Sequence, residues 1–171
     1  IKVALMMMWL TAGRVGDALK LKEKSVKCNG TNLDVTFEDG KGVVLSKGKC
    51  SVHTLVPECW RPLLVTHLAK LQPEQLLVPA SEGITLQQRG AACNTALQRV
   101  DKQVTTRSIR RGALQAMAMG SDEIPPANLE TLMAYAGHLR PTTTKRYLDW
   151  GRLFGDAARF QRGAAASLLH R

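Results

Sequence analysis

The sequence predicts a mostly helical α+β domain that carries a small antiparallel sheet. The stretch 33–38 alternates apolar and polar residues with a period of two, as a half-buried strand does. The turn dipeptides Asn29-Gly30 and Asp39-Gly40 border this stretch, whereas most of the chain shows helical spacing of its apolar residues. A chain of 171 residues, 44% of them hydrophobic, is long enough for one domain with one sizeable core.

The first twenty residues predict two helices separated by a break. Lys2 to Leu10 is apolar nearly all round, which is typical of a buried helix. Thr11-Ala12-Gly13 interrupts it, and Arg14 then lies at the junction with the second helix, behind a wall of Met and Leu side chains. A buried Arg needs an anionic partner. That partner is either Asp17 on the second helix or a bound phosphate.

Residues 33–56 predict the small sheet of two or three strands. Besides 33–38, short strands are expected at 43–45 and 52–56. The connecting turns carry three lysines, Lys41, Lys47 and Lys49. Each of them can either lie over a nearby site as a proton donor or protect the edge of the sheet from other strands.

Residues 57–100 predict two helices joined by a loop. A helix is expected from 57 to 70, then a loop to 83 with an extended piece at 76–78. The next helix, 85–100, has an apolar stripe made of Leu86, Ala91, Ala92, Ala96, Leu97 and Val100. Its polar side, which includes Arg89, either faces a nucleic-acid backbone or is simply exposed to solvent.

The stretch from 105 to 147 predicts three more helices with short connections. One helix is expected at 108–119, where Gly120 ends it, and another at 129–136, where Asn128 caps its start. Pro141 and the threonines after it are typical of a third helix start. The tail from 152 to 171 is expected to form a further helix or two.

Three residues of this stretch can together handle a phosphate. Arg110 presents a planar guanidinium that can bind two phosphate oxygens at once. His138 can donate a hydrogen bond or move a proton near neutral pH. Tyr147 is an oxygen nucleophile once nearby cations stabilise its anion.

The composition favours a polyanionic partner. Lys and Arg number 24 against 14 Asp and Glu, a formal net charge of +10. Such an excess favours nucleic acid over an acidic membrane surface, or else serves only solubility. The four cysteines are scattered without a Cys-x-x-Cys pair, so neither a zinc site nor any other cofactor is expected, and the thiols are consistent with a reducing, intracellular location.

Five short runs resemble the catalytic domain of the tyrosine recombinases, the phage-integrase family. The run 11–19 around Arg14 resembles the first box of that family, and 39–42 holds Lys41 where the family carries a hairpin lysine. The run 107–111 resembles the His-x-x-Arg box, and 136–138 resembles Leu-Gly-His. Tyr147 follows His138 by nine residues, the position of the family's nucleophile. The resemblance extends from Leu10 to Asp149.

This resemblance implies a fold and a reaction that needs no metal. The implied catalytic residues are Arg14, Lys41, Arg107, Arg110, His138 and Tyr147. Tyr147 would cleave a DNA strand through a 3′-phosphotyrosyl link, with Lys41 as the general acid, although Lys47 or Lys49 could take that role. Double-stranded DNA is the implied partner, contacted also by Lys47, Arg89, Arg111, Lys145 and Arg146.

Two departures from the family pattern leave alternatives open. Arg107 stands where the family has His, and Asp17 stands where Glu is commoner. Arg107 stays protonated, so it cannot act as a base, although it can bind phosphate. The alternatives are a scaffold protein with a recombinase fold, a type IB topoisomerase-like enzyme, or a basic helical module in which the boxes are accidental.

The resemblance also predicts the organisation of the chain. Residues 1–151 would form the catalytic domain and 152–171 a helical tail through which copies self-associate on DNA as dimers or tetramers. Because Ile1 falls inside the catalytic domain, the family's N-terminal DNA-clamping domain is expected to be missing from this chain. Membrane insertion is not expected. The runs 110–114 and 147–151 resemble recombinases of eukaryotic mobile elements, which predicts a nuclear location, or a cytoplasmic one for any other source.

Overall fold

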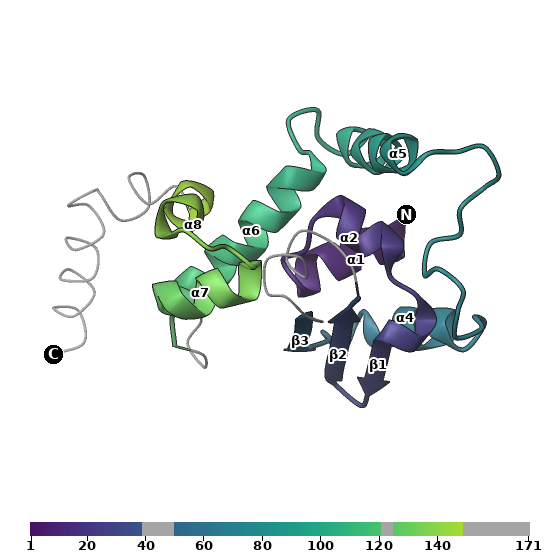
Figure 1. Cartoon of the computed structure of the whole chain (residues 1–171), viewed down its shortest axis with the longest axis horizontal. Coiled ribbons are helices and arrows are strands. Elements are labelled where there is room, and N and C mark those ends of the chain that lie inside the picture. Colours follow the sequence, from purple (N-terminus) through teal and green to yellow (C-terminus); the bar gives the residue numbers. More distant parts are fainter. Residues whose placement is uncertain (39–49, 121–124, 149–171) are drawn as a thin grey trace, which may run out of the picture.

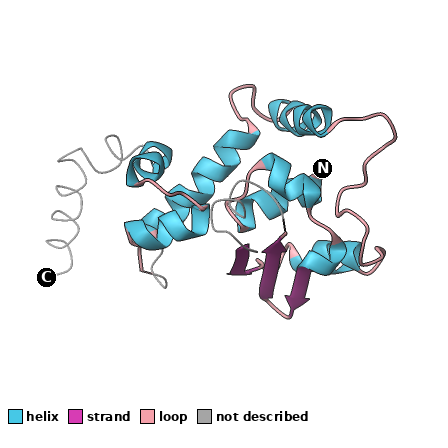
Figure 2. Ribbon diagram, viewed as in Figure 1, coloured by secondary structure: helices cyan, strands magenta, loops and turns pink. Residues whose placement is uncertain are grey.

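The computed structural model describes residues 1–38, 50–120 and 125–148. Its elements are α1 (Lys2–Leu10), α2 (Val15–Lys20), the short 3-10 helix η1 (Glu23–Ser25), β1 (Val26–Asn29), β2 (Asn32–Phe37), β3 (Cys50–Leu55), α4 (Arg61–Leu68), α5 (Leu86–Gln98), α6 (Thr106–Met119), α7 (Leu129–Ala136) and α8 (Pro141–Leu148). Figure 1 shows α6, α7 and α8 gathered on one side and the sheet on the other, with α1 and α2 between them. The predicted α+β class with a small antiparallel sheet is confirmed, as the colouring in Figure 2 makes plain.

The sheet has three antiparallel strands in the order β1-β2-β3. The predicted strands at 33–38 and 52–56 correspond to β2 and β3, whereas β1 was missed because its four residues are too few to show a period. Asn29 pairs with Asn32, so the predicted turn at Asn29-Gly30 is the loop of the first hairpin. The strand expected at 43–45 lies outside the described residues.

Two hydrophobic clusters hold the domain together. The larger one joins α1 to α2, the sheet and α4, and its fully buried members include Met7, Leu33 and Leu64. The second joins α6, α7 and α8 through residues such as Leu114 and Leu132. Helix α1 packs on α6 and thereby connects the two clusters. The prediction that α1 is a buried helix is confirmed, since six of its nine residues are buried.

The helix predicted at 85–100 is present as α5, but most of its apolar stripe is not buried. Among its residues only Cys93 is buried, while Val100, just beyond the helix, is 90% exposed. The helix contacts the rest of the domain along one narrow edge, where Gly90 approaches Val15 and Cys93 packs with Leu19. Because α5 contacts the domain only along this edge, most of its apolar side chains stay accessible to solvent.

Two other predicted boundaries moved by a few residues. Helix α6 begins at Thr106, two residues early, because the backbone N–H of Thr105 donates to Ser108 Oγ at 3.1 Å in an N-terminal cap. Helix α4 begins at Arg61 after a turn at 57–60, not at Pro57. The extended piece expected at 76–78 is present, and Leu76 there pairs with Lys22 in an isolated bridge.

Candidate active site

Arg110 lies buried where the two halves of the domain meet. It is 4% exposed, and α6 directs its guanidinium at the break between α1 and α2 and at the end of α7. Its Nη1 donates to the carbonyl of Ala12, and its Nη2 donates to the carbonyl of Ala136 at 2.6 Å. A second hydrogen of Nη2 points to His138 Nε2 at 3.0 Å.

Local backbone geometry presents these two carbonyls to Arg110. Ala12 has a φ of 45°, an unusual conformation for a residue with a Cβ, and this places its carbonyl toward α6. Gly137 ends α7 with φ 60° and ψ 43°, and the N–H of His138 then bonds back to the carbonyl of Met133 at 2.9 Å. The predicted break at 11–13 and the Gly-His run therefore both shape the surroundings of Arg110.

Arg110 carries a positive charge that these partners do not neutralise. Carbonyls and a neutral imidazole are dipoles, and Arg110 Nε is buried with no hydrogen-bond partner in the described part of the chain. Burial, together with the nearby charge of Arg14, lowers the pKa of Arg110 to about 10. A buried, incompletely satisfied cation of this kind is suited to an anion that accepts hydrogen bonds.

His138 is buried and neutral at physiological pH. It is 8% exposed, and burial and then the charges of Arg110 and Arg14 lower its pKa from the ordinary 6.5 to about 4. Its Nδ1 lies 2.9 Å from Oγ1 of Thr144, which is completely buried on α8. Arg110, His138 and Thr144 thus form one continuous hydrogen-bonded chain across α6 and α8.

Arg14 and Arg110 line the same small pocket, of about 40 Å³. The Nη1 of Arg14 lies 3.7 Å from Asp17 Oδ2, so the ion pair considered for Arg14 is present. The expectation that Arg14 is buried is wrong, because its side chain is 33% exposed at the start of α2 and extends toward the pocket from the outside. The ion pair and a phosphate contact are therefore compatible.

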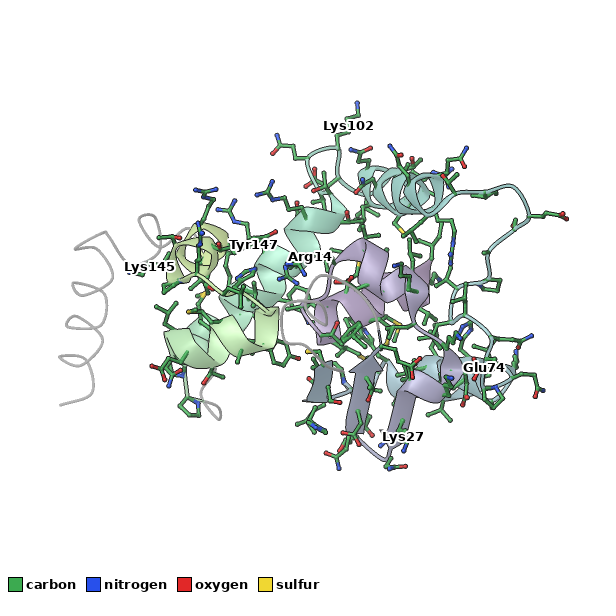
Figure 3. All side chains as sticks on the ribbon, viewed as in Figure 1. Arg14, Lys27, Glu74, Lys102, Lys145 and Tyr147 are labelled. Atoms are coloured by element: carbon green, nitrogen blue, oxygen red, sulfur yellow. The ribbon has the colours of Figure 1, made fainter. Side chains whose placement is uncertain are left out.

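Tyr147 lies against the same cluster. Its ring centroid is 5.1 Å from that of His138, and the guanidinium carbon atoms of Arg110 and Arg107 lie 5.4 and 5.6 Å from it. Leu148, the next residue, is completely buried and anchors this end of α8 as expected, whereas Trp150 lies outside the described residues. Figure 3 shows Tyr147 beside α8 and α6, with Arg14 next to it on the side of α2.

The structure therefore brings together five of the six predicted catalytic residues, namely Arg14, Arg107, Arg110, His138 and Tyr147. The sixth, Lys41, lies outside the described residues, as do Lys47 and Lys49. Phe37 and Cys50 pair at the ends of β2 and β3, and both line the pocket. The chain thus leaves this pocket just before the predicted lysine segment and returns to it just after.

The predicted DNA-contacting residues have different surroundings. Lys145 and Arg146 are exposed on α8, and Arg111 is half-buried on α6. Arg89 is directed inward, where its Nη2 donates to the carbonyls of Val78 and of Leu19, the latter at 3.3 Å. In this geometry Arg89 joins α5 to the loop before it, and its predicted role at the DNA has no support.

Two residues of the site were missed from the sequence. Thr144 is one of three consecutive threonines, and no local pattern distinguishes it from its neighbours. Tyr135 lines the pocket and donates a hydrogen bond from its hydroxyl to the carbonyl of Leu10, and burial raises its pKa. Its position in the apolar run of α7 gives no signal that distinguishes it from an ordinary core residue.

No helix in the described ranges is both long and apolar enough to cross a membrane. Within the same ranges, no group of three or more His, Cys, Asp or Glu side chains could hold a metal ion.

No protein-family model matches this chain, and no curated protein matches it in sequence. Several solved structures are similar in fold, and three of them illustrate the similarity. The XerH site-specific recombinase bound to its difH substrate in a pre-cleavage complex has a TM-score of 0.65 at 16% identity and matches 95% of this chain. The post-cleavage complex of XerH with palindromic difH has a TM-score of 0.63 at 16% identity, over 99% of this chain.

The integrase of the Tn1549 transposon, in complex with transposon right end DNA, has a TM-score of 0.57 at 15% identity and matches 95% of this chain. The matched region is 45%, 46% and 58% of those three chains, so this chain spans about half the length of the proteins it resembles. With the α+β architecture described above, these similarities show that the chain has the fold of the tyrosine recombinase catalytic domain.

Proposed function

We propose that this protein cleaves and rejoins DNA strands through a 3′-phosphotyrosyl intermediate, with Tyr147 as the nucleophile. The observation that carries the proposal is the placement of the Tyr147 ring against Arg110, a buried cation with an unpartnered Nε. A phosphodiester is an anion that accepts several hydrogen bonds, and it fits the need of Arg110 for such a partner.

In the proposed reaction, the Tyr147 oxygen attacks the phosphorus and passes its proton to a water molecule as the bond forms. The bond from phosphorus to the 5′-oxygen breaks, and that oxygen takes up a proton to leave as a hydroxyl. Arg110 and Arg14 stabilise the negative charge that builds on the two non-bridging oxygens. His138 donates a hydrogen bond to one of these oxygens, and Lys41 supplies the proton to the 5′-oxygen.

Rejoining runs the same steps in reverse with another 5′-hydroxyl as the attacking group. The phosphotyrosyl bond stores the energy of the broken phosphodiester, so no other energy source is needed. Whether the product is an integrated, excised or resolved DNA depends on how several subunits pair their strands. We propose that copies of the chain self-associate on DNA through residues 152–171, which lie outside the described residues.

A covalent trapping experiment tests the assignment of Tyr147. The probe is a duplex selected by this protein from a randomised pool and nicked near the bound site, so that cleavage releases a short fragment and cannot reverse. Wild-type protein is expected to form an adduct that survives denaturing electrophoresis. Tyr147→Phe removes only the hydroxyl, so it should bind the same duplex and form no adduct.

The chain offers a matched control, because Tyr135 is the other of its two tyrosines and lines the pocket formed by Arg14 and Arg110. Tyr135→Phe should still form the adduct, since its hydroxyl is engaged with the Leu10 carbonyl. An adduct formed by Tyr147→Phe but lost in Tyr135→Phe would transfer the nucleophile role to Tyr135. DNA binding without any adduct in the wild type would favour the scaffold alternative.

A further inference from the structure

Thr144 is a buried hydroxyl with an unusual position. Of the three consecutive threonines at the start of α8, Thr142 is exposed, Thr143 is half-buried and Thr144 is completely buried. It lies one helical turn before Tyr147, and its Oγ1 is 2.9 Å from Nδ1 of His138. A buried hydroxyl needs a hydrogen-bond partner, and here that partner is the imidazole of the site.

The protons on this hydrogen-bonded chain can be assigned from its ends. A neutral imidazole has one N–H and one lone pair, and a guanidinium has only donors. His138 Nε2 faces Nη2 of Arg110 at 3.0 Å, so Nε2 must accept and Nδ1 must carry the proton. Nδ1 then donates to Thr144 Oγ1.

A phosphate at the site would require the opposite tautomer of His138, with the proton on Nε2. Phosphate oxygens accept hydrogen bonds, so His138 can bind one of them only by donating from Nε2. Its Nδ1 must then accept. Among neutral side chains, a hydroxyl can change from acceptor to donor by rotating about one bond without moving its oxygen.

We propose that Thr144 is a positioning residue that lets His138 change tautomer when a phosphate enters the site. In the empty site, Nδ1–H donates to Thr144 and Nε2 accepts from Arg110. With phosphate bound, Arg110 turns a donor toward the anion, Nε2–H donates to a phosphate oxygen, and the Thr144 hydroxyl donates to Nδ1. The imidazole loses one proton at Nδ1 and gains one at Nε2 by exchange with water, so its net charge does not change.

This inference rests on the proposed function only in taking a phosphate as the ligand. Among the described residues, the charged and titratable groups that act on His138 are Arg110 on α6, Arg14 at the start of α2, and Tyr147 on α8. Arg107 lies over the Tyr147 ring. Burial, and then the charges of Arg110 and Arg14, lower the pKa of His138 and keep it neutral in the free protein. The proposed exchange moves a proton between its two ring nitrogens and leaves its charge unchanged.

Nitrogen-15 NMR of the 171-residue chain labelled at histidine tests the proposal, because protonated and unprotonated ring nitrogens resonate far apart. The signals of His138 are identified by their loss in His138→Gln. In the free protein, Nδ1 should be the protonated nitrogen. Inorganic phosphate should move the proton to Nε2.

Three variants separate a positioning role from simple packing. Thr144→Val keeps the shape and removes the hydroxyl, so His138 should lose its single defined tautomer and phosphate should bind about tenfold more weakly, as expected for one lost hydrogen bond. Thr144→Ser restores the hydroxyl and should restore the exchange. Thr143→Val changes the neighbouring threonine and should leave both tautomers as in the wild type.

Three results would overturn the proposal. These are a free protein that already carries its proton on Nε2, a His138 whose tautomer does not respond to phosphate, and a Thr144→Val protein that behaves as the wild type does. These outcomes are independent of strand cleavage. A tautomer change without a Tyr147 adduct would refute the proposed function alone, and an adduct without a tautomer change would refute this inference alone.

Discussion

At the scale of single residues, the site is built around a cation held by neutral groups. The carbonyls of Ala12 and Ala136 and the imidazole of His138 fix the orientation of Arg110 without cancelling its charge. Ion pairing with a protein carboxylate would have stabilised the folded chain more, but it would also have competed with a ligand. The carboxylate closest to the site, Asp17, is instead paired with Arg14 at its rim.

The buried, neutral state of His138 predicts a loss of stability in mild acid. The unfolded chain takes up a proton on this His as the pH falls below about 6.5, whereas the folded chain does so only near pH 4. The contribution to stability is therefore fully present above pH 6.5 and is lost as the pH falls toward 4. Between pH 7 and pH 5 the free energy of unfolding should fall by roughly 2 kcal/mol from this residue.

Urea denaturation of the wild type and of His138→Gln at both pH values measures this effect. The variant should lack this part of the pH dependence. His53→Gln is measured beside it as the control, because it makes the same replacement at a histidine that is 75% exposed on β3 and outside the site. Equal pH dependence in His138→Gln and the wild type would contradict the assignment.

Arg107 predicts a second residue-scale outcome. It is exposed in the first turn of α6, with its guanidinium over the Tyr147 ring, and it stands at the place of the His in the box that the run 107–111 resembles. Arg107→His should keep or raise strand cleavage, because His can also bind phosphate and can transfer a proton. Arg107→Ala should lower cleavage, since it removes both the phosphate contact and the cation–π contact.

Single-turnover cleavage of the nicked duplex measures these rates, with Lys102→Ala as the control. Lys102 is an equally exposed cation in the loop before α6, and it lies away from Tyr147 (Figure 3). A large loss of cleavage in a folded Arg107→His protein would show that Arg has taken a role that His cannot fill.

At the scale of elements, the site depends on where the helices end, because the helix ends supply the carbonyls that hold Arg110. The end of α1 directs the Ala12 carbonyl and the end of α7 directs the Ala136 carbonyl, both toward Arg110. Gly112 in the middle of α6 lets the helix approach Trp9 of α1, where an added Cβ would lie 3.1 Å from the indole ring. Close packing of α1 on α6 is what carries the first helix end to the Arg110 side chain.

The end of α7 gives an element-scale prediction. Gly137→Ala adds a Cβ at a φ of 60°, which should destabilise the fold by about 1 kcal/mol and shift the Ala136 carbonyl and His138. Gly30→Ala is the matched control, because Gly30 has a φ of 61° in the turn between β1 and β2 with nothing within 4 Å of an added Cβ.

Both variants should lose similar stability in urea denaturation, but only Gly137→Ala should also weaken the binding of a labelled DNA duplex. Equal DNA binding by the two variants would show that the backbone at Gly137 does not position the site.

At the scale of the whole molecule, the site lies where two hydrophobic clusters meet. One cluster holds Arg14 through α1, α2 and the sheet, and the other holds His138 and Tyr147 through α7 and α8. Arg110 on α6 contacts both halves. Unfolding of either half would therefore disassemble the site.

The net charge of +10 predicts DNA binding that weakens steeply with salt. Fluorescence anisotropy with a labelled duplex at several salt concentrations gives the slope of log affinity against log salt. Lys145→Ala should reduce the magnitude of this slope by about 0.9, the value for one lost phosphate contact. Lys27→Ala removes an equal charge from β1, far from α8 (Figure 3), and should change the slope little. Equal effects of both variants would indicate that the charge acts only through the overall field.

Most helices and strands could be predicted from the sequence because their signals are local. The N-cap at Asn128, the left-handed Gly137 and the alternation in β2 each depend on residues within a few positions of one another. The start of α6 differed from the prediction because Thr105 and Ser108 are both residue types that cap helices, and in the structure Thr105 is the cap and Ser108 its partner within the first turn. The stripe of α5 failed because helical periodicity shows which face could be buried, but not whether a partner covers it.

By itself, the sequence determined the mostly helical class, the order of most elements, the basic charge and the set of residues that we propose bind a phosphate. Only the tertiary structure decided that Arg89 turns inward, that Thr144 joins His138, and that Arg110 holds the carbonyl of Ala12 across 98 positions of the chain. Helix caps and turns depend on neighbouring residues, so they can be predicted from short stretches. Hydrogen bonds between buried groups depend on which surfaces pack together, and that depends on the whole chain at once.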